Sequence, residues 1–166
     1  MSFMCERCGE EHPGPPMAYS STAPGRWYTL ADEEKAASRL DGELCVIAGT
    51  EWFLRANLEV PVSDAEEPLV FSAWVQVEPE VFRTILERWD EPGRVDDPGY
   101  PGALANDLAG FPATLGLEVE IQTDAPGTRA RAVPLVSDHP LSVACWEGID
   151  LARVRSLAEL LAHPAG

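Results

Sequence analysis

The fold is decided by residues 51–60, which read Glu-Trp-Phe-Leu-Arg-Ala-Asn-Leu-Glu-Val. Apolar side chains occupy alternate positions from Trp52 to Val60, and Arg55 and Glu59 lie at positions between them. A period of two is that of a β-strand with one buried face. We therefore expect a strand whose even-numbered side chains enter the core, and Pro61 indicates that its end lies at an edge of the sheet.

Two further apolar segments flank this strand. Residues 44–47, Leu-Cys-Val-Ile, form a short apolar run before Gly49, and residues 69–77 again place apolar side chains at alternate positions. Both patterns are typical of strands bounded by turns. We expect these segments and residues 51–60 to form three consecutive antiparallel strands.

Helical spacing appears after residue 77. Pro79 suits the first turn of a helix, and the spacing i, i+3, i+4 and i+7 is occupied by Phe82, Ile85, Leu86 and Trp89. We expect this apolar stripe to lie on the sheet. Further helices are expected at residues 32–38, from 139 through 146, and from Asp150 onward.

A second hairpin is expected near the C-terminal third of the chain. Residues 117–122 alternate in the strand period, residues 124–127 read Asp-Ala-Pro-Gly, and a second strand follows over 129–136. Across this hairpin, Glu118 and Glu120 are expected to face Arg129 and Arg131 as solvated cross-strand pairs.

Proline and glycine are dense in two stretches, residues 9–26 and residues 91–113. We interpret the first as an extended connector without regular structure, and the second as a long ordered loop with a helical turn at 103–108. The predicted fold is α+β: an antiparallel sheet of about five strands with helices packed on one face. Residues 1–26 are expected to form a metal-binding-like Cys-x-x-Cys-Gly turn and connector, and residues 27–166 a single α+β domain.

The charge balance restricts the partners. Against 12 basic side chains stand 28 acidic ones, which gives a formal net charge of −16. Such a chain is repelled by phosphate backbones and by acidic membrane surfaces, so neither nucleic acid nor a membrane is expected as a partner. A protein, in particular a basic one, or a small ligand is expected instead. The first residues lack a basic leader and an apolar segment, which favours a cytoplasmic location.

The N-terminal residues form half of a metal site. Cys5 and Cys8 are two thiols in a Cys-x-x-Cys-Gly turn, and His12 follows four residues later. Two thiolates at this spacing suit tetrahedral zinc, and a reducing compartment keeps them available. Cys45 is the favoured fourth ligand because it would tether the N-terminus to a core strand, although it also suits a small buried side chain. His139, Cys145, a carboxylate or water remain alternatives.

The other histidines do not identify an enzyme. Asp138 precedes His139, but this pair is better interpreted as the start of a helix than as a general base with its orienting carboxylate. His163 falls in the last turn of the final helix, where it complements the helix dipole. The chain contains no Gly-x-Ser-x-Gly elbow, no phosphate-binding glycine loop and no His-Glu-x-x-His motif.

Several short motifs follow one another along most of the chain: Cys5-x-x-Cys8-Gly9-x-x-His12, Trp52-Phe53-x-Arg55, Leu58-Glu59-Val60-Pro61, Trp74-Val75, Asn106-x-Leu108-x-x-Phe111-Pro112-x-Thr114, and His139-Pro140-Leu141 with Gly148-Ile149. In this order they resemble a bacterial family of uncharacterised proteins, domain of unknown function 2199. The resemblance implies no particular activity, so function has to be inferred from the residues.

Two functions are compatible with these residues. The favoured one is a zinc-stabilised binding or interaction domain, because nothing identifies a catalytic constellation. The alternative is a metal-assisted hydrolase that keeps an open coordination position on zinc, with His139 or Glu59 nearby. The number of protein ligands separates the two, since four ligands make a structural site and three plus water admit catalysis.

Overall fold

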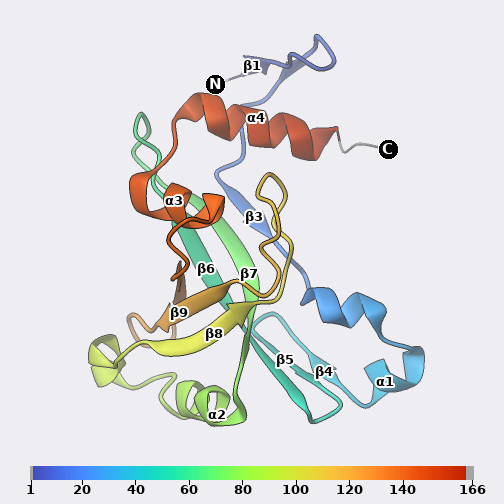
Figure 1. Ribbon diagram of the computed structural model, residues 1–166, viewed down its shortest axis with the longest axis vertical. Coiled ribbons are helices and arrows are strands. Elements are labelled where there is room, and N and C mark those ends of the chain that lie inside the picture. Colours follow the sequence, from blue (N-terminus) through green and yellow to red (C-terminus); the bar gives the residue numbers. More distant parts are fainter. Residues whose placement is uncertain (1, 164–166) are drawn as a thin grey trace.

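The computed structural model describes residues 2–163 and confirms a mixed α+β fold (Figure 1). Its centre is a pair of long antiparallel strands, β6 (Glu51–Val60) and β7 (Leu69–Val77). They pair along their whole length, from Trp52 opposite Val77 to Val60 opposite Leu69. The shorter β5 (Leu44–Ile47) pairs with β6 in the same antiparallel sense, which confirms the three consecutive strands predicted from the sequence.

Five strands close into a barrel. From β7 the ring continues through β8 (Tyr100–Leu104), β9 (Glu118–Gln122) and β10 (Arg131–Pro134), and it returns to β6. The closing pair is parallel and is registered at a single position, Arg131 opposite Asn57. The prediction of an antiparallel sheet of about five strands with helices on one face is therefore wrong.

The length of β6 and β7 explains the closure. Because they contain 10 and 9 residues, one edge of each strand can serve two partners in succession. The outer edge of β7 pairs first with β3 (Ala18–Ser20) and then with β8, while that of β6 pairs with β5 and then with β10. Twisted strands of this length curve away from a flat sheet and allow the ring to close.

Two stretches assigned to irregular structure contain strands. The loop predicted over 91–113, with a helical turn at 103–108, instead forms the 3₁₀ helix η2 (Pro92–Asp96) and the strand β8. In the sequence, Pro101 and Gly102 are typical of a loop, so the pattern of residues does not predict this strand. A Cβ atom on Gly102 would lie 2.5 Å from Cγ1 of Val75, so only glycine permits the close approach of β8 to β7. Within 9–26, β3 likewise pairs in parallel with β7.

The helices lie at different ends of the barrel. In Figure 1, α2 (Pro79–Glu87) lies at the lower end, whereas α3 (Pro140–Glu147) and α4 (Leu151–Ala162) lie at the upper end. On the side of the barrel, η1 (Gly25–Thr29) and α1 (Asp32–Ala36) lead into β4 (Arg39–Leu40), which pairs with β5. In the part of the chain that the structure describes, no helix is long and apolar enough to cross a membrane.

Alternation along β6 and β7 separates two apolar clusters. As predicted, even-numbered side chains of β6, such as Leu54 and Leu58, enter the main core. The opposite face of the strands carries Phe53 and Trp74, which pack in a second buried cluster with Leu30, Cys45, Ile47 and Ala105. Both faces of these strands are therefore partly covered, which accounts for buried side chains on each face.

The N-terminal residues form a small unit of their own, β1 (Phe3–Met4) paired antiparallel with β2 (Glu11–His12). We call residues 2–16, which contain this pair, the N-terminal hairpin. Figure 1 shows it beside α4, away from the barrel strands. The first and last parts of the described chain therefore meet at one end of the molecule.

Candidate metal centre

The turn between β1 and β2 presents both of its thiols on one side. The amide of Gly9 donates to the carbonyl of Cys5 at 2.8 Å, and the amide of Cys5 donates to the carbonyl of Glu10 at 2.9 Å. Gly9 adopts a φ of 73°, a left-handed conformation that glycine reaches without a steric penalty. This backbone explains the glycine after the second cysteine.

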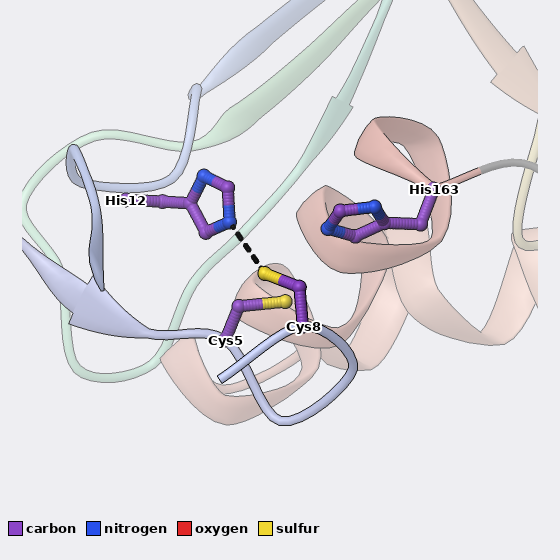
Figure 2. A group of neighbouring side chains, drawn as sticks. All are labelled: Cys5, Cys8, His12 and His163. Carbon is purple, nitrogen blue, oxygen red and sulfur yellow. Dashed lines mark hydrogen bonds between the residues drawn. The ribbon is translucent and has the colours of Figure 1, made fainter. Parts of the chain in front are cut away.

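His12 returns to the thiols through the pairing of β1 with β2. It lies opposite Phe3 in the ladder, and the two rings are 5.9 Å apart. Its Nε2 atom lies 3.1 Å from Sγ of Cys8 (Figure 2). The three N-terminal residues expected as ligands are thus brought together by local structure alone.

The fourth member of the group comes from the other end of the described chain. His163 caps the C-terminal end of α4, and one ligand atom from each residue of the group lies within 4.8 Å of the others: Cys5, Cys8, His12 and His163. Figure 2 shows the His163 ring directed toward the thiols and His12. Its Nε2 atom is buried and has no hydrogen-bond partner among the described residues. A buried imidazole nitrogen without a partner is costly, and a metal ion would supply one.

This set of donors fits one metal ion. Tetrahedral zinc with bonds of roughly 2.0–2.3 Å holds neighbouring ligand atoms about 3.3–3.8 Å apart. Four atoms that already lie within 4.8 Å of one another need small side-chain movements to reach that geometry. Cys5 is buried, Cys8 is exposed, and both histidines are half-buried, so the group lies at the surface with one sheltered side.

Electrostatics around the thiols are unfavourable to two free thiolates. A hydrogen bond from the backbone of Glu10 lowers the pKa of Cys8, but desolvation and the neighbouring Cys5 thiol together outweigh it, so the pKa of Cys8 is raised. A thiolate beside a second thiolate is stabilised by a cation between them. Without a cation, the neighbouring thiol opposes ionisation.

The remaining cysteines lie elsewhere. Cys45 is fully buried in the second apolar cluster, where desolvation raises its pKa to about 11, and it is not among the residues that the structure brings together here. Cys145 lies on α3, and burial raises its pKa to about 11 as well. Both behave as small apolar side chains.

The structure places His139 at the start of α3. Its Nδ1 atom accepts a hydrogen bond from the amide of Leu141, and its Nε2 atom lies 2.7 Å from the carbonyl oxygen of Pro112. Both ring nitrogens are therefore engaged with the helix and with the loop at Pro112, which confirms that His139 lies at the start of a helix. Glu59 lies exposed on β6.

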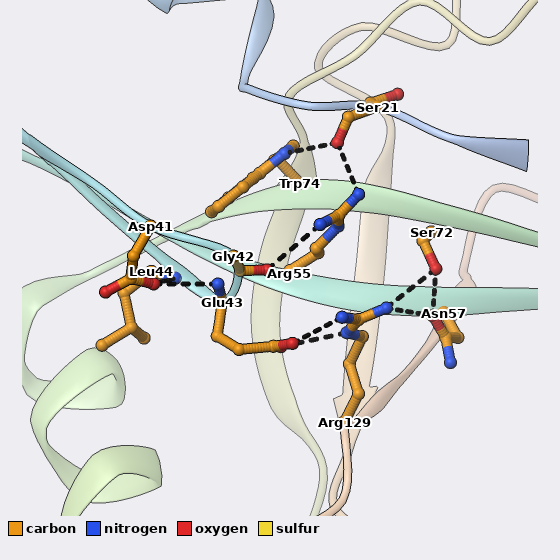
Figure 3. A network of polar contacts seen from close by, with 10 residues as sticks. All are labelled: Ser21, Asp41, Gly42, Glu43, Leu44, Arg55, Asn57, Ser72, Trp74 and Arg129. Atoms are coloured by element: carbon orange, nitrogen blue, oxygen red, sulfur yellow. Dashed lines mark hydrogen bonds and ion pairs between the residues drawn. The ribbon is translucent and has the colours of Figure 1, made fainter.

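A second polar cluster joins the barrel strands (Figure 3). The guanidinium of Arg129 donates through Nε to Glu43 at 3.0 Å and through Nη1 to Ser72 at 3.0 Å. Arg55 donates to the carbonyl of Ser21 at 3.0 Å and lies over the Trp74 ring. The Arg129 bonds tie the residues just before β10 to the β4–β5 turn and to β7, beside the position where β10 meets β6, so they support this short strand pairing.

The predicted ion pairs across the second hairpin are wrong. Arg129 binds Glu43 on the β4–β5 turn, and Arg131 lies 3.5 Å from Asp124, so neither pairs with Glu118 or Glu120. Barrel closure brings β10 beside β6 and Arg129 toward Glu43, outside the hairpin, whereas the partner of Arg131 lies in the hairpin's own turn.

Sequence reasoning missed His163 as a member of the metal group. The chain has 3 histidines in total. Once Cys5, Cys8 and His12 are taken as ligands, only two histidines are left that could supply an imidazole nitrogen as the fourth. Its position at the end of an amphipathic helix explained it equally well as a dipole partner. The packing of α4 against the N-terminal hairpin is what brings His163 beside the other three donors.

Comparison with known families gives a match over most of the chain. The model of an uncharacterised protein conserved in bacteria (DUF2199) matches residues 4–149. Cys5, Cys8 and His12 lie inside the matched range, whereas His163 lies beyond it. No curated protein and no solved structure matches the chain.

Proposed function

Since the chain belongs to the DUF2199 family, which is described as uncharacterised proteins conserved in bacteria, we propose a function from its own geometry: a structural zinc ion bound by Cys5, Cys8, His12 and His163 stabilises a binding domain. The observation that carries the proposal is the convergence of His163, from the C-terminal end of α4, on three donors of the N-terminal hairpin. One ion would then join the two ends of the described chain.

Zinc is the metal that these donors favour. Two sulfur and two imidazole nitrogen donors in a near-tetrahedral arrangement are typical of structural zinc sites, and harder cations such as Mg²⁺ or Ca²⁺ prefer oxygen. The absence of a dedicated oxygen ligand in the group supports zinc over those ions. Binding of zinc would also give the buried Nε2 atom of His163 a partner in place of a hydrogen bond.

Four protein donors favour a structural role. A catalytic zinc keeps one position for water or substrate, and the hydrolase alternative therefore requires water in place of one of the four donors. His163 is the donor whose replacement would convert the site. We accordingly propose that the ion fastens the N-terminal hairpin to α4 and leaves the barrel surface to bind a partner.

The proposed partner is a basic protein. The excess of 28 acidic over 12 basic side chains creates a negative field that attracts such a partner and repels nucleic acid and acidic membranes. A complex of this kind weakens steeply as salt screens the field. Pull-down from bacterial extract at low and high salt tests this part, and a partner retained equally at both would contradict it.

Metal analysis tests the zinc site. Protein purified from cells without added metal should contain one zinc per chain by mass spectrometry of the metal. The substitutions Cys5→Ser and His163→Ala should each lower this content, whereas Cys45→Ala, a matched control outside the group, should leave it unchanged. Full zinc content in His163→Ala combined with loss in Cys45→Ala would overturn the proposed ligand set.

A further inference from the structure

We propose that Cys5 and Cys8 are a redox-sensitive pair, and that their oxidation by a peroxide to a disulfide expels the metal ion and frees the N-terminal hairpin from α4. This inference rests on the proposed zinc site, and it assigns that site a second chemistry. The pair lies in one turn, and their sulfur atoms already lie within 4.8 Å of each other.

The two thiols differ in their exposure to solvent, and a reaction with a dissolved peroxide requires one exposed thiol. Cys8 is exposed and can meet a peroxide from solvent, whereas Cys5 is 1 % exposed and meets only its neighbours. Redox-sensing sites combine an accessible thiolate with a second, resolving thiol beside it. Cys8 therefore takes the first role and Cys5 the second.

The reaction balances with hydrogen peroxide as the oxidant. The Cys8 thiolate attacks one peroxide oxygen, the O–O bond breaks, and Cys8 sulfenic acid and hydroxide form. The Cys5 thiolate then attacks the Cys8 sulfur, so the S–S bond forms as the S–O bond breaks and a second hydroxide leaves. Two protons from solvent convert both hydroxides to water. The sulfur pair loses two electrons, the peroxide gains them, and the metal ion departs because a disulfide is a poor ligand.

Other contacts between the hairpin and α4 are sparse. Among residues 2–163, one hydrogen bond joins residues 2–16 to α4, from the amide of Glu6 to Oε1 of Glu159 at 3.2 Å. Cavities of about 320, 400 and 470 Å³ also border Phe3 of the hairpin and residues of α4. A loosely packed boundary contributes little apolar stabilisation, so loss of the metal removes the main connection.

Release of the hairpin would uncover apolar surface. The cavity of about 320 Å³ is lined on the hairpin side by Phe3 and His12, and on the other side by Tyr19, Ala158 and Leu161. Ala158 is buried and would become accessible to solvent once the hairpin departs, and the half-buried Tyr19 and Leu161 would become more exposed. Oxidation would thus change the binding properties of this end of the molecule.

The other two thiols should not compete for the oxidant. Cys45 is 0 % exposed, and Cys145 is half-buried on α3. Burial raises the pKa of each to about 11, which leaves little thiolate at neutral pH. The reaction is therefore directed to the N-terminal pair by the access of Cys8 to solvent.

Zinc release under hydrogen peroxide tests the inference. The full chain, purified with its zinc, is treated with hydrogen peroxide while a chromogenic chelator reports free zinc and mass spectrometry counts disulfides. We expect one zinc released per Cys5–Cys8 disulfide formed. The double substitution Cys45→Ala and Cys145→Ser should release zinc at the same rate, whereas Cys8→Asp, which keeps an anionic ligand but cannot form the disulfide, should retain whatever zinc it binds.

The outcomes separate this inference from the proposed function. Protein that contains zinc and retains it in hydrogen peroxide would overturn the redox inference but not the proposed zinc site. Protein that contains no zinc when purified would overturn both the redox inference and the zinc site. Hydrogen–deuterium exchange gives a second measurement: oxidation should remove protection from residues 2–16 and leave β6 and β7 unchanged, and dithiothreitol with zinc should restore it. A hairpin that stays protected after zinc release would contradict its detachment.

Discussion

The barrel and the N-terminal hairpin are stabilised in different ways. The barrel buries side chains from five strands and from the helices at its ends, so apolar packing is its main support. The hairpin has two short strands, and Cys5 is the only buried apolar side chain among residues 2–16. A segment this small needs a metal ion or disulfide to hold one conformation. One chain therefore contains a region that folds by hydrophobic burial and a region that, in the function we propose, depends on a metal ion held by four donor atoms.

The largest effect should come from the barrel core. Leu58 lies on β6 and is 0 % exposed, so Leu58→Ala removes apolar contacts and leaves a cavity. We expect a loss of about 2–5 kcal/mol in the free energy of unfolding, measured by denaturant titration. Zinc content per folded chain should not change. A loss below about 1 kcal/mol would show that packing is not what supports the barrel.

A smaller effect is expected at the seam between β6 and β10. Arg129→Ala removes the ion pair with Glu43 and the hydrogen bond to Ser72, but Glu43 is partly exposed and regains water. We expect destabilisation of about 1 kcal/mol, since screening by solvent weakens partly exposed pairs. Arg131→Ala, whose pair with Asp124 is longer and more exposed, is the matched control and should cost less. Equal costs would indicate that the seam does not depend on the cluster around Arg129.

The smallest effect is expected at the start of α3. His139→Ala removes the side-chain cap on the amide of Leu141 and should cost about 0.5–1 kcal/mol of stability by thermal denaturation. His139→Asn, which can cap the same amide, should recover most of this loss. Zinc content should match the unaltered chain in both variants. Loss of zinc in either one would place His139 at the metal centre and contradict its structural role.

Periodicity predicted the local elements but not their closure. The spacing of apolar side chains correctly indicated β5, β6, β7, α2, the hairpin of β9 and β10, and the two C-terminal helices. It missed β8, because Pro101 and Gly102 indicate a loop unless the strand beside them is known. It also missed the ring, because the pairing of β10 with β6 joins residues far apart in sequence.

The candidate metal site shows the same limit. Cys5, Cys8 and His12 could be identified because their spacing is local, and the structure brings them together. The donor beside them in the structure is His163, whereas the sequence favoured Cys45, since a cysteine in a core strand offered the obvious tether. Cys45 instead lies in the apolar cluster with Phe53 and Trp74. Ligands supplied from distant segments depend on tertiary packing, which the spacing of residues does not report.

The most direct test of the account is the coordination shell of the bound metal. X-ray absorption spectroscopy of the purified full chain should show one zinc with two sulfur ligands at about 2.3 Å and two imidazole nitrogens at about 2.0–2.1 Å. In His163→Ala, one imidazole should be replaced by a light ligand from water while both sulfurs stay. Three sulfur ligands in the unaltered chain, or an unchanged shell in His163→Ala, would contradict the account, because His163 would then not join the hairpin to α4.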